Sequence, residues 1–179
     1  MENRNSVFIA RSLDGYIADK NGGIDWLHSI PNPDNLDLGY NTFCDKIDAI
    51  VMGRKTFDVV CSFDIPWPYD KPVFVVSNSI RNLSTKFEGK VELVNGSPKE
   101  MVKHIYGKGY TKLYIDGGTL IQSFLKDDLI DEMIISTIPV LLGGGSPLFG
   151  ELPKPIVFEH VKSDVFLNAI IQDTYRRKR

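Results

Sequence analysis

One glycine, two cations and a hydroxyl stand together at Gly53-Arg54-Lys55-Thr56, between the apolar run Ala49 to Met52 and residues with helical spacing. The first amides and the dipole of a helix favour an anion, and glycine lets the backbone approach it. The side chains of Arg54 and Lys55 can pair with a phosphate. The alternative is an ordinary helix start with solvated Arg and Lys.

Two further joints between a strand pattern and polar residues suit phosphate or ribose. Asp116-Gly117-Gly118-Thr119 can cradle a pyrophosphate with backbone donors, and Ser77-Asn78-Ser79-Ile80-Arg81 offers hydroxyls and a guanidinium. Open α/β sheets bind ligands at the carboxyl ends of their strands. Three such joints on one sheet edge indicate an extended, multiply phosphorylated ligand, and a dinucleotide fits.

The familiar nucleotide and hydrolase motifs are absent. No G-x-G-x-x-G follows a strand, no G-x-x-x-x-G-K-[ST] occurs, and Gly143-Gly144-Gly145 fits neither pattern. The histidines His28, His104 and His160 are scattered, with no H-E-x-x-H and no G-x-S-x-G. Hydride transfer from a nicotinamide needs few protein nucleophiles or metals, because the cofactor carries the difficult step.

The amino-acid composition limits the classes of protein and of partner that fit this chain. The 179 residues predict a single domain over residues 1–179, and the net charge of -2 argues against a nucleic-acid partner. The basic end Tyr175 to Arg179 is expected to be a solvated, frayed tail. No segment resembles a signal peptide or a membrane span. The two cysteines, Cys44 and Cys61, fit a reducing compartment, so we expect a cytoplasmic protein without a membrane partner.

Strand and helix patterns alternate through most of the chain, which predicts a mainly parallel sheet with helices on both faces. Ser97 to Glu100 carries the signature of a capping box. The expected strands are Val7 to Ala10, Ala49 to Met52, Val73 to Val76, Val91 to Val94, Leu113 to Ile115 and Met133 to Val140, and the expected helices are Asp34 to Lys46, Gly118 to Lys126 and one that begins at Ser97.

The end of the chain differs. Two β-rich runs, Ile156 to Phe166 and Ala169 to Tyr175, are separated by only Leu167 and Asn168. A connection this short cannot hold a crossover helix, so the pair is predicted to form an antiparallel hairpin appended to the parallel sheet.

The order and spacing of five motifs resemble the dihydrofolate reductase superfamily, especially the reductase domain of riboflavin-biosynthesis deaminase/reductases and their stand-alone relatives. The motifs are IARSLDGYIADKNGGIDWL, DAIVMGRKTF, VFVVSNS, LYIDGGTLIQSFL and DEMIISTIPVLLGGG. The resemblance implies a mostly parallel eight-stranded sheet with helices on both faces, an antiparallel C-terminal strand, and NADPH laid across the strand ends.

The resemblance also assigns roles to individual residues. Ala10 would meet the nicotinamide with its backbone, under a mobile loop that contains Ile17 and Ala18. The cations Arg54, Lys55 and Arg81 favour NADP over NAD, because the 2'-phosphate adds charge. The complete set implied for the cofactor is Ala10, Ile17, Ala18, Gly53, Arg54, Lys55, Thr56, Ser77, Asn78, Arg81, Gly117, Gly118, Thr119 and Leu120.

For the substrate, the resemblance implies contacts from Trp26, Asp37, Tyr40 and Phe57. Asp37 falls where folate enzymes keep the acidic residue that holds the pterin and assists its protonation. The alternative is that Asp37 belongs to a capping box begun by Asp34, and the sequence leaves both open.

The acidic turn at Asp116 and the segment Asp48-Ala49-Ile50 correspond to the riboflavin branch rather than to folate enzymes. The chain lacks the H-x-E and P-C-x-x-C signature of the deaminase that accompanies this reductase. The predicted function is an NADPH-dependent reductase most like 5-amino-6-(5-phosphoribosylamino)uracil reductase. The alternatives are pterin reduction and a non-catalytic NADPH-binding module. The resemblance further implies a homodimer, to which Pro139 to Leu142 could contribute.

Overall fold

A computed structural model describes residues 3–78 and 83–179 of the chain. Eight strands form one sheet in the order β5-β4-β3-β6-β1-β7-β10-β9, and β2 pairs with β8 in a small second sheet. The strands are β1 Arg4–Ser12, β2 Tyr16–Ala18, β3 Ala49–Gly53, β4 Val73–Val76, β5 Val91–Val94, β6 Lys112–Asp116, β7 Glu132–Ile138, β8 Ser146–Pro147, β9 Phe158–Phe166 and β10 Ile170–Arg177. The α-helices are α1 Tyr40–Cys44, α2 Arg54–Ser62, α3 Pro98–Gly107 and α4 Gly118–Lys126, and the 3-10 helices are Asp25–His28 and Thr85–Phe87.

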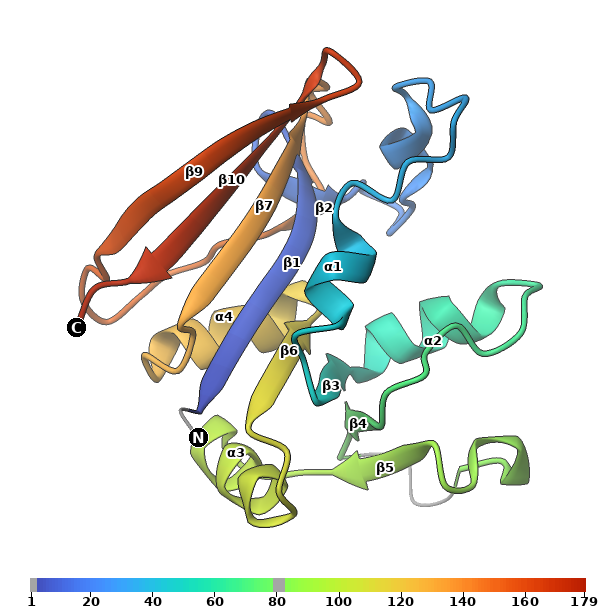
Figure 1. Cartoon of the computed structure of the whole chain (residues 1–179), viewed down its shortest axis with the longest axis vertical. Coiled ribbons are helices and arrows are strands. Elements are labelled where there is room, and N and C mark those ends of the chain that lie inside the picture. The colour runs from blue at the N-terminus through green and yellow to red at the C-terminus, as the bar shows by residue number, and fades with distance from the viewer. Residues whose placement is uncertain (1–2, 79–82) are drawn as a thin grey trace.

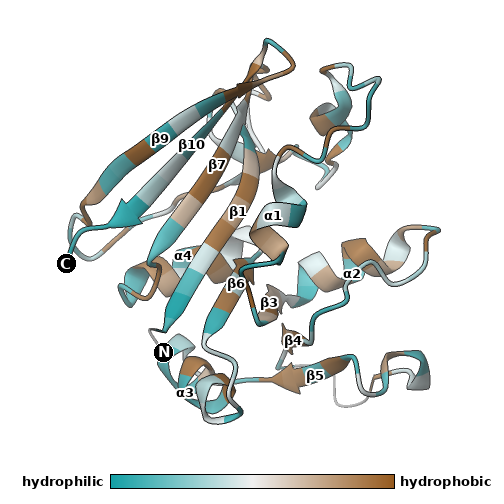
Figure 2. Ribbon diagram, in the orientation of Figure 1, coloured by the Kyte–Doolittle hydropathy of each residue, from teal (hydrophilic) through white to brown (hydrophobic). Residues whose placement is uncertain are grey.

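The six strands from β5 to β7 in this order are parallel, as the sequence predicts. Strands β3 and β4 are apolar at successive positions (Figure 2), which is typical of strands buried between helices. One core contains buried residues of α3 and α4, and a second contains Phe43 of α1 and Phe57 of α2. The two helix pairs therefore cover opposite faces of the sheet (Figure 1), which confirms the expected architecture.

The C-terminal hairpin is also present. Strand β10 is antiparallel to both β7 and β9, and β9 therefore runs in the same direction as the rest of the sheet. Leu167 and Asn168 have φ of 52° and 54°, which is the left-handed pair that a two-residue hairpin turn requires. The turn is closed by the Ala169 amide, which donates to the Phe166 carbonyl at 3.0 Å.

The basic end is not frayed, so that prediction is wrong. Strand β10 continues to Arg177, whose Nε donates to Asp128 Oδ1 at 2.6 Å while Nη2 donates to Asp128 Oδ2 at 2.9 Å. Arg179 pairs with Asp131. These carboxylates lie in the turn before β7, and they fix the chain end against the sheet.

The predicted helix Asp34 to Lys46 is also wrong in extent, because only Tyr40–Cys44 is α-helical. Asn35, Leu38 and Gly39 have positive φ, which no right-handed helix allows. The side chain of Asn32 accepts from the Leu36 amide at 2.9 Å and donates to the Leu36 carbonyl at 2.8 Å. Such local side-chain bonds compete with helix formation.

The capping box of α3 is confirmed. The Ser97 amide donates to Glu100 Oε2 at 2.8 Å, and the Glu100 amide donates to Ser97 Oγ. The short strands β2 and β8 were not predicted from the sequence. Within the described residues, no helix has the length and apolar character needed to cross a bilayer.

Candidate active site

Four adjacent strands bring the predicted cofactor residues to one edge of the sheet. In the order β4-β3-β6-β1, the carboxyl ends of the first three lead into Ser77, Gly53 and Gly117, and β1 carries Ala10 close to its carboxyl end. Paired strands are about 4.8 Å apart, so the positions on β4, β3 and β6 span about 10 Å, and Ala10 on β1 lies beyond them. That span suits an extended ligand such as a dinucleotide.

The joints after β3 and β6 are in direct contact. Gly117 has φ of 98°, and a Cβ added there would lie 2.5 Å from Thr56 Oγ1. The Thr56 hydroxyl therefore sits directly over the Gly117 backbone. Only glycine permits this approach, which joins two of the three predicted phosphate sites into one cradle.

The loop after β1 closes over the same cradle. A Cβ at Gly118 would lie 2.6 Å from Ile17 Cδ1 and 3.5 Å from the Pro147 carbonyl oxygen. Ile17 and Ala18 belong to β2, which is held by β8. The carboxylate of Asp14 accepts from the amide of Gly143 at 2.8 Å. The glycine cluster thus helps to anchor the loop rather than forming a phosphate site of its own.

The sheet opens between β1 and β6 beside this cradle. The pairing of β1 with β6 ends at Ser6 opposite Tyr114, whereas its pairing with β7 continues to Ser12 opposite Ile138. The Phe8 carbonyl accepts instead from the Tyr114 hydroxyl at 2.9 Å. The β6-facing backbone near Ala10 is consequently released from the ladder and can hydrogen-bond a planar amide.

The helices that begin at the cradle present uncapped amides. Neither α2 nor α4, each of nine residues, has a side-chain cap at its N-terminus. Arg54 Nε donates to both carboxylate oxygens of Asp58, at 2.7 and 2.8 Å, so its charge is partly neutralised. Lys55 is exposed and forms no ion pair with any described residue. The glycine cradle, the open strand edge and the free helix ends fit a dinucleotide cofactor.

The adenosine side is less completely described. Ser77 is 7% exposed and its amide donates to the Val94 carbonyl at 3.0 Å, whereas Asn78 is exposed. Arg81 lies outside the described residues. Thr119 is exposed on the first turn of α4, and Leu120 packs into the core with 6% exposure. Leu120 can therefore contribute only its backbone to a ligand.

A cluster of phenols surrounds Asp116, a grouping that sequence reasoning missed. Tyr114 and Asp116 lie on the same face of β6, and the ring of Tyr114 is 6.4 Å from that of Tyr40 on α1. Burial raises the pKa of the Asp116 carboxyl to about 6, while bonds from the Gly117 amide and the Tyr114 side chain oppose the shift. Burial also raises the pKa of Tyr40, Tyr69 and Tyr114. Asp116 is thus able to hold a proton near neutral pH.

In contrast to Asp116, Asp37 has a carboxyl group whose pKa is lowered. It is exposed in the turn before α1, where its carboxylate accepts from the Asn41 amide at 2.8 Å and the Gly39 amide at 3.1 Å. The Asn41 bond is the main cause that lowers the pKa of Asp37. The Asp37 carboxylate therefore satisfies amides at the start of α1, whose N-cap residue is Gly39, and no capping box begun by Asp34 is present. An ionised Asp37 can anchor a substrate N–H and is poorly suited to donate a proton.

The remaining predicted substrate residues have different surroundings. Tyr40 is partly buried beside Asp116. Trp26 follows the loop of Ile17, and its Nε1 is buried without a partner among the described residues, so it is a donor available to a ligand or water. Phe57 is 5% exposed, and its ring packs against Trp67 and Phe87. We therefore leave Phe57 out of the site.

Across residues 3–78 and 83–179, no group of three potential metal-ligating side chains is present. The chemistry on this edge is instead that of backbone amides, hydroxyls, two cations and one carboxyl group with a raised pKa.

Comparison with known proteins agrees with this geometry. Residues 6–171 match the family model of the RibD C-terminal domain. The uncharacterized protein YwjB of Bacillus subtilis is 36% identical over 85% of this chain and 86% of its own length. The crystal structure of a putative riboflavin biosynthesis protein from Shewanella sp. PV-4 is 55% identical, with a TM-score of 0.95 over 98% of this chain and 99% of that one.

More distant structures share the fold. A Thermotoga maritima diaminohydroxyphosphoribosylaminopyrimidine deaminase/5-amino-6-(5-phosphoribosylamino)uracil reductase matches with a TM-score of 0.75 at 15% identity, over 99% of this chain and 57% of that one. A dihydrofolate reductase from Enterococcus faecalis, complexed with NADP(H), matches with a TM-score of 0.68 at 18% identity, over 98% and 97% of the two chains. The fold is therefore that of dihydrofolate reductase.

Proposed function

This chain belongs to the family of the RibD C-terminal domain, and from that premise we propose that it is an NADPH-dependent reductase. The observation that carries the proposal is the contact between the two phosphate-suited joints, in which Thr56 lies directly over Gly117. This cradle lies beside the opened edge of β1. Family membership supports a reductase of the RibD type, and the finer assignments of cofactor and substrate are our own.

Different residues would bind different parts of the cofactor. The amides at the starts of α2 and α4, with Thr56 and Lys55, would hold its phosphates. The backbone of β1 at Ala10 would orient the nicotinamide amide, and Ile17 would cover it. Bound NADPH would supply a hydride. Ser77 and Asn78 would lie toward the adenosine end, because β4 is the strand on the far side of β3.

We assign the proton that accompanies the hydride to Asp116, whose carboxyl has a pKa of about 6. A general acid works best when its pKa lies near the working pH. Asp37, ionised and exposed at the turn before α1, would bind the substrate instead. The substrate class is a small nitrogen heterocycle, with 5-amino-6-(5-phosphoribosylamino)uracil as the compound to test first.

Titration calorimetry with NADPH and NADH at fixed ionic strength tests the cofactor. We expect NADPH to bind more tightly than NADH, because the 2'-phosphate adds an interaction with cations. The Lys55→Gln variant should weaken NADPH binding by roughly fivefold. Lys99→Gln is the matched control, since Lys99 is the second residue of α3, as Lys55 is of α2. Absence of binding by either nucleotide would reject the proposal.

The absorbance of NADPH then tests turnover. Oxidation with the ribosylaminouracil phosphate is the expected result, and Asp116→Asn should lower the rate constant without abolishing NADPH binding. Oxidation with dihydrofolate alone would instead establish pterin reduction. NADPH binding without oxidation by either compound would favour the non-catalytic alternative.

A further inference from the structure

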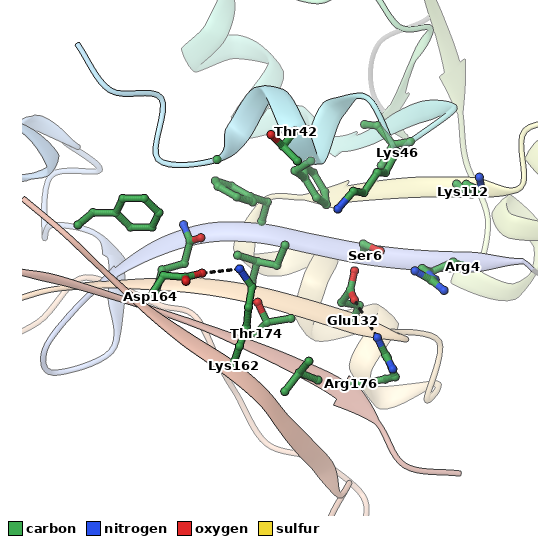
Figure 3. A pocket seen from close by; sticks show the side chains of 18 residues that line it. Arg4, Ser6, Thr42, Lys46, Lys112, Glu132, Lys162, Asp164, Thr174 and Arg176 are labelled. Carbon is green, nitrogen blue, oxygen red and sulfur yellow. Dashed lines mark hydrogen bonds and ion pairs between the residues drawn. The ribbon is translucent and has the colours of Figure 1, made fainter. Parts of the chain in front are cut away.

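A pocket lies between α1 and one face of the sheet (Figure 3). Its volume is about 760 Å³, and its walls come from α1 and from the face of β1, β7, β10 and β9. Tyr40 of α1 contacts Tyr114 near Asp116, whereas Thr42 and Lys46 line this pocket. Arg4, Lys112 and Glu132 begin their strands, so the pocket reaches the edge of the sheet opposite the cofactor cradle.

The charges of the pocket are unbalanced. Five cationic and two acidic side chains line it. Both acids already have partners, since Lys162 lies 2.5 Å from Asp164 and Arg176 lies 3.9 Å from Glu132. The other three cations are Arg4, Lys46 and Lys112, and none forms an ion pair with a described residue.

The geometry of these cations makes a bound anion favourable. Arg4 and Lys112 are direct partners on neighbouring strands, and like charges in that position repel each other. Figure 3 shows Lys46 of α1 at the same end of the pocket as Arg4 and Ser6. An oxyanion placed between α1 and β1 would relieve the repulsion and accept from several donors at once.

Two hydroxyls on the pocket wall supply a further observation. Ser6 is 4% exposed and Thr174 is 6% exposed, and both line the pocket. Neither side chain has a hydrogen-bond partner among residues 3–78 and 83–179. Two unpaired hydroxyls on the wall of one cavity can donate to, or accept from, a polar occupant.

The rest of the wall is apolar. Phe8, Ile134 and Val161 lie along the pocket together with Phe43 and Phe166. We propose that this pocket binds a small phosphomonoester, with its phosphate near Arg4, Lys46 and Ser6 and an apolar or aromatic body along this wall. The site is separate from the proposed cofactor site and does not depend on the reductase assignment.

Phenyl phosphate is the probe, and titration calorimetry of the whole chain is the measurement. We expect saturable binding in the millimolar range or tighter, and weaker binding of inorganic phosphate, which lacks the apolar body. Lys46→Gln and Arg4→Gln should each lower the affinity for phenyl phosphate by roughly fivefold or more. Thr174→Val should lower this affinity by a smaller factor. The control Lys126→Gln removes a cation outside the pocket and should change nothing.

Each variant is also titrated with NADPH, whose affinity should be unchanged if the two sites are separate. Failure of phenyl phosphate to saturate, or equal affinity in wild type and both charge variants, would overturn the proposal. The proposal would also be overturned if sedimentation showed that Val161→Asp converts a dimer to monomers. The pocket would then be covered by a second copy of the chain.

Discussion

The carboxyl group of Asp116 is held where its ionisation is unfavourable. Burial raises its pKa to about 6 from a usual 3.8. The folded state therefore binds a proton more strongly than the unfolded state, and stability falls as the pH rises from about 4 through about 6. The same environment that makes Asp116 a useful acid costs the fold free energy at neutral pH.

Asp116→Asn removes this ionisation at nearly constant shape. We expect the variant to exceed wild type in unfolding free energy by up to about 3 kcal/mol at pH 7, from a shift of about 2 pKa units. The difference should disappear near pH 4, where the wild-type carboxyl is protonated in the folded state. Urea unfolding at the two pH values measures it. A difference independent of pH would mean that the carboxyl is not perturbed.

Gly117 offers a residue-level test of the cradle. In Gly117→Ala, the new Cβ would lie 2.5 Å from Thr56 Oγ1, so the Thr56 hydroxyl or the Gly117 turn must shift. We expect NADPH affinity to fall by about tenfold or more, measured by calorimetry. Gly109→Ala is the matched control, because its φ of 94° is close to the 98° of Gly117 and no atom lies within 4 Å of the added Cβ. Equal losses of NADPH affinity in Gly117→Ala and Gly109→Ala would indicate that backbone strain at positive φ, and not the contact with Thr56, causes the effect.

At the scale of elements, sequence patterns predicted those helices, strands and turns that are determined by interactions between residues close in sequence. The individual strand segments, the capping box at Ser97 and the turn at Leu167-Asn168 each depend on a few neighbouring residues. The periodicity of Leu36, Tyr40, Phe43 and Ile47 suggested a long helix. Before Tyr40, however, the Leu36 and Gly39 amides donate to the side chains of Asn32 and Asp37. Such local bonds compete with helix formation.

Interactions distant in sequence were not predictable in the same way. The glycines and hydroxyls of the cradle could be recognised by type, since each follows a strand pattern. The grouping of Asp116 with Tyr40, Tyr69 and Tyr114 depends on where α1 and the segment before β4 lie over β6. The ordered chain end depends likewise on the pairing of Arg177 with Asp128, which is 49 residues away.

The Arg177–Asp128 pair allows a prediction about β10. The hydrogen bond from Arg177 is the main cause that lowers the pKa of Asp128. Asp128→Asn should therefore reduce the unfolding free energy at pH 7 by about 1 kcal/mol, and the loss should shrink as acid protonates Asp128 in wild type. Urea unfolding measures this change. Asp127→Asn is the control, because no ion pair of Asp127 occurs in the described chain. Similar losses in both variants would contradict a role for the pair.

For the molecule as a whole, one group of exposed apolar side chains is a candidate contact between copies of the chain. Leu13 and Leu141 are 60% and 68% exposed, and the Leu13 amide donates to Val140 next to Leu141. Val165 and Ile171 face each other across the hairpin near the same end of the sheet, with 67% and 48% exposure. Exposed apolar groups of this kind often mark protein interfaces.

We expect the chain to be a homodimer that buries these side chains, with Pro139 to Leu142 in the contact. Leu141→Asp should shift the mass measured by sedimentation equilibrium toward the 20.2 kDa monomer, because a carboxylate cannot be buried there without a partner. Ile65→Asp is the control, since Ile65 is 57% exposed but follows α2, away from the hairpin. A wild-type mass equal to one chain would refute the dimer. A dimer that Leu141→Asp leaves intact would place the contact elsewhere on the surface.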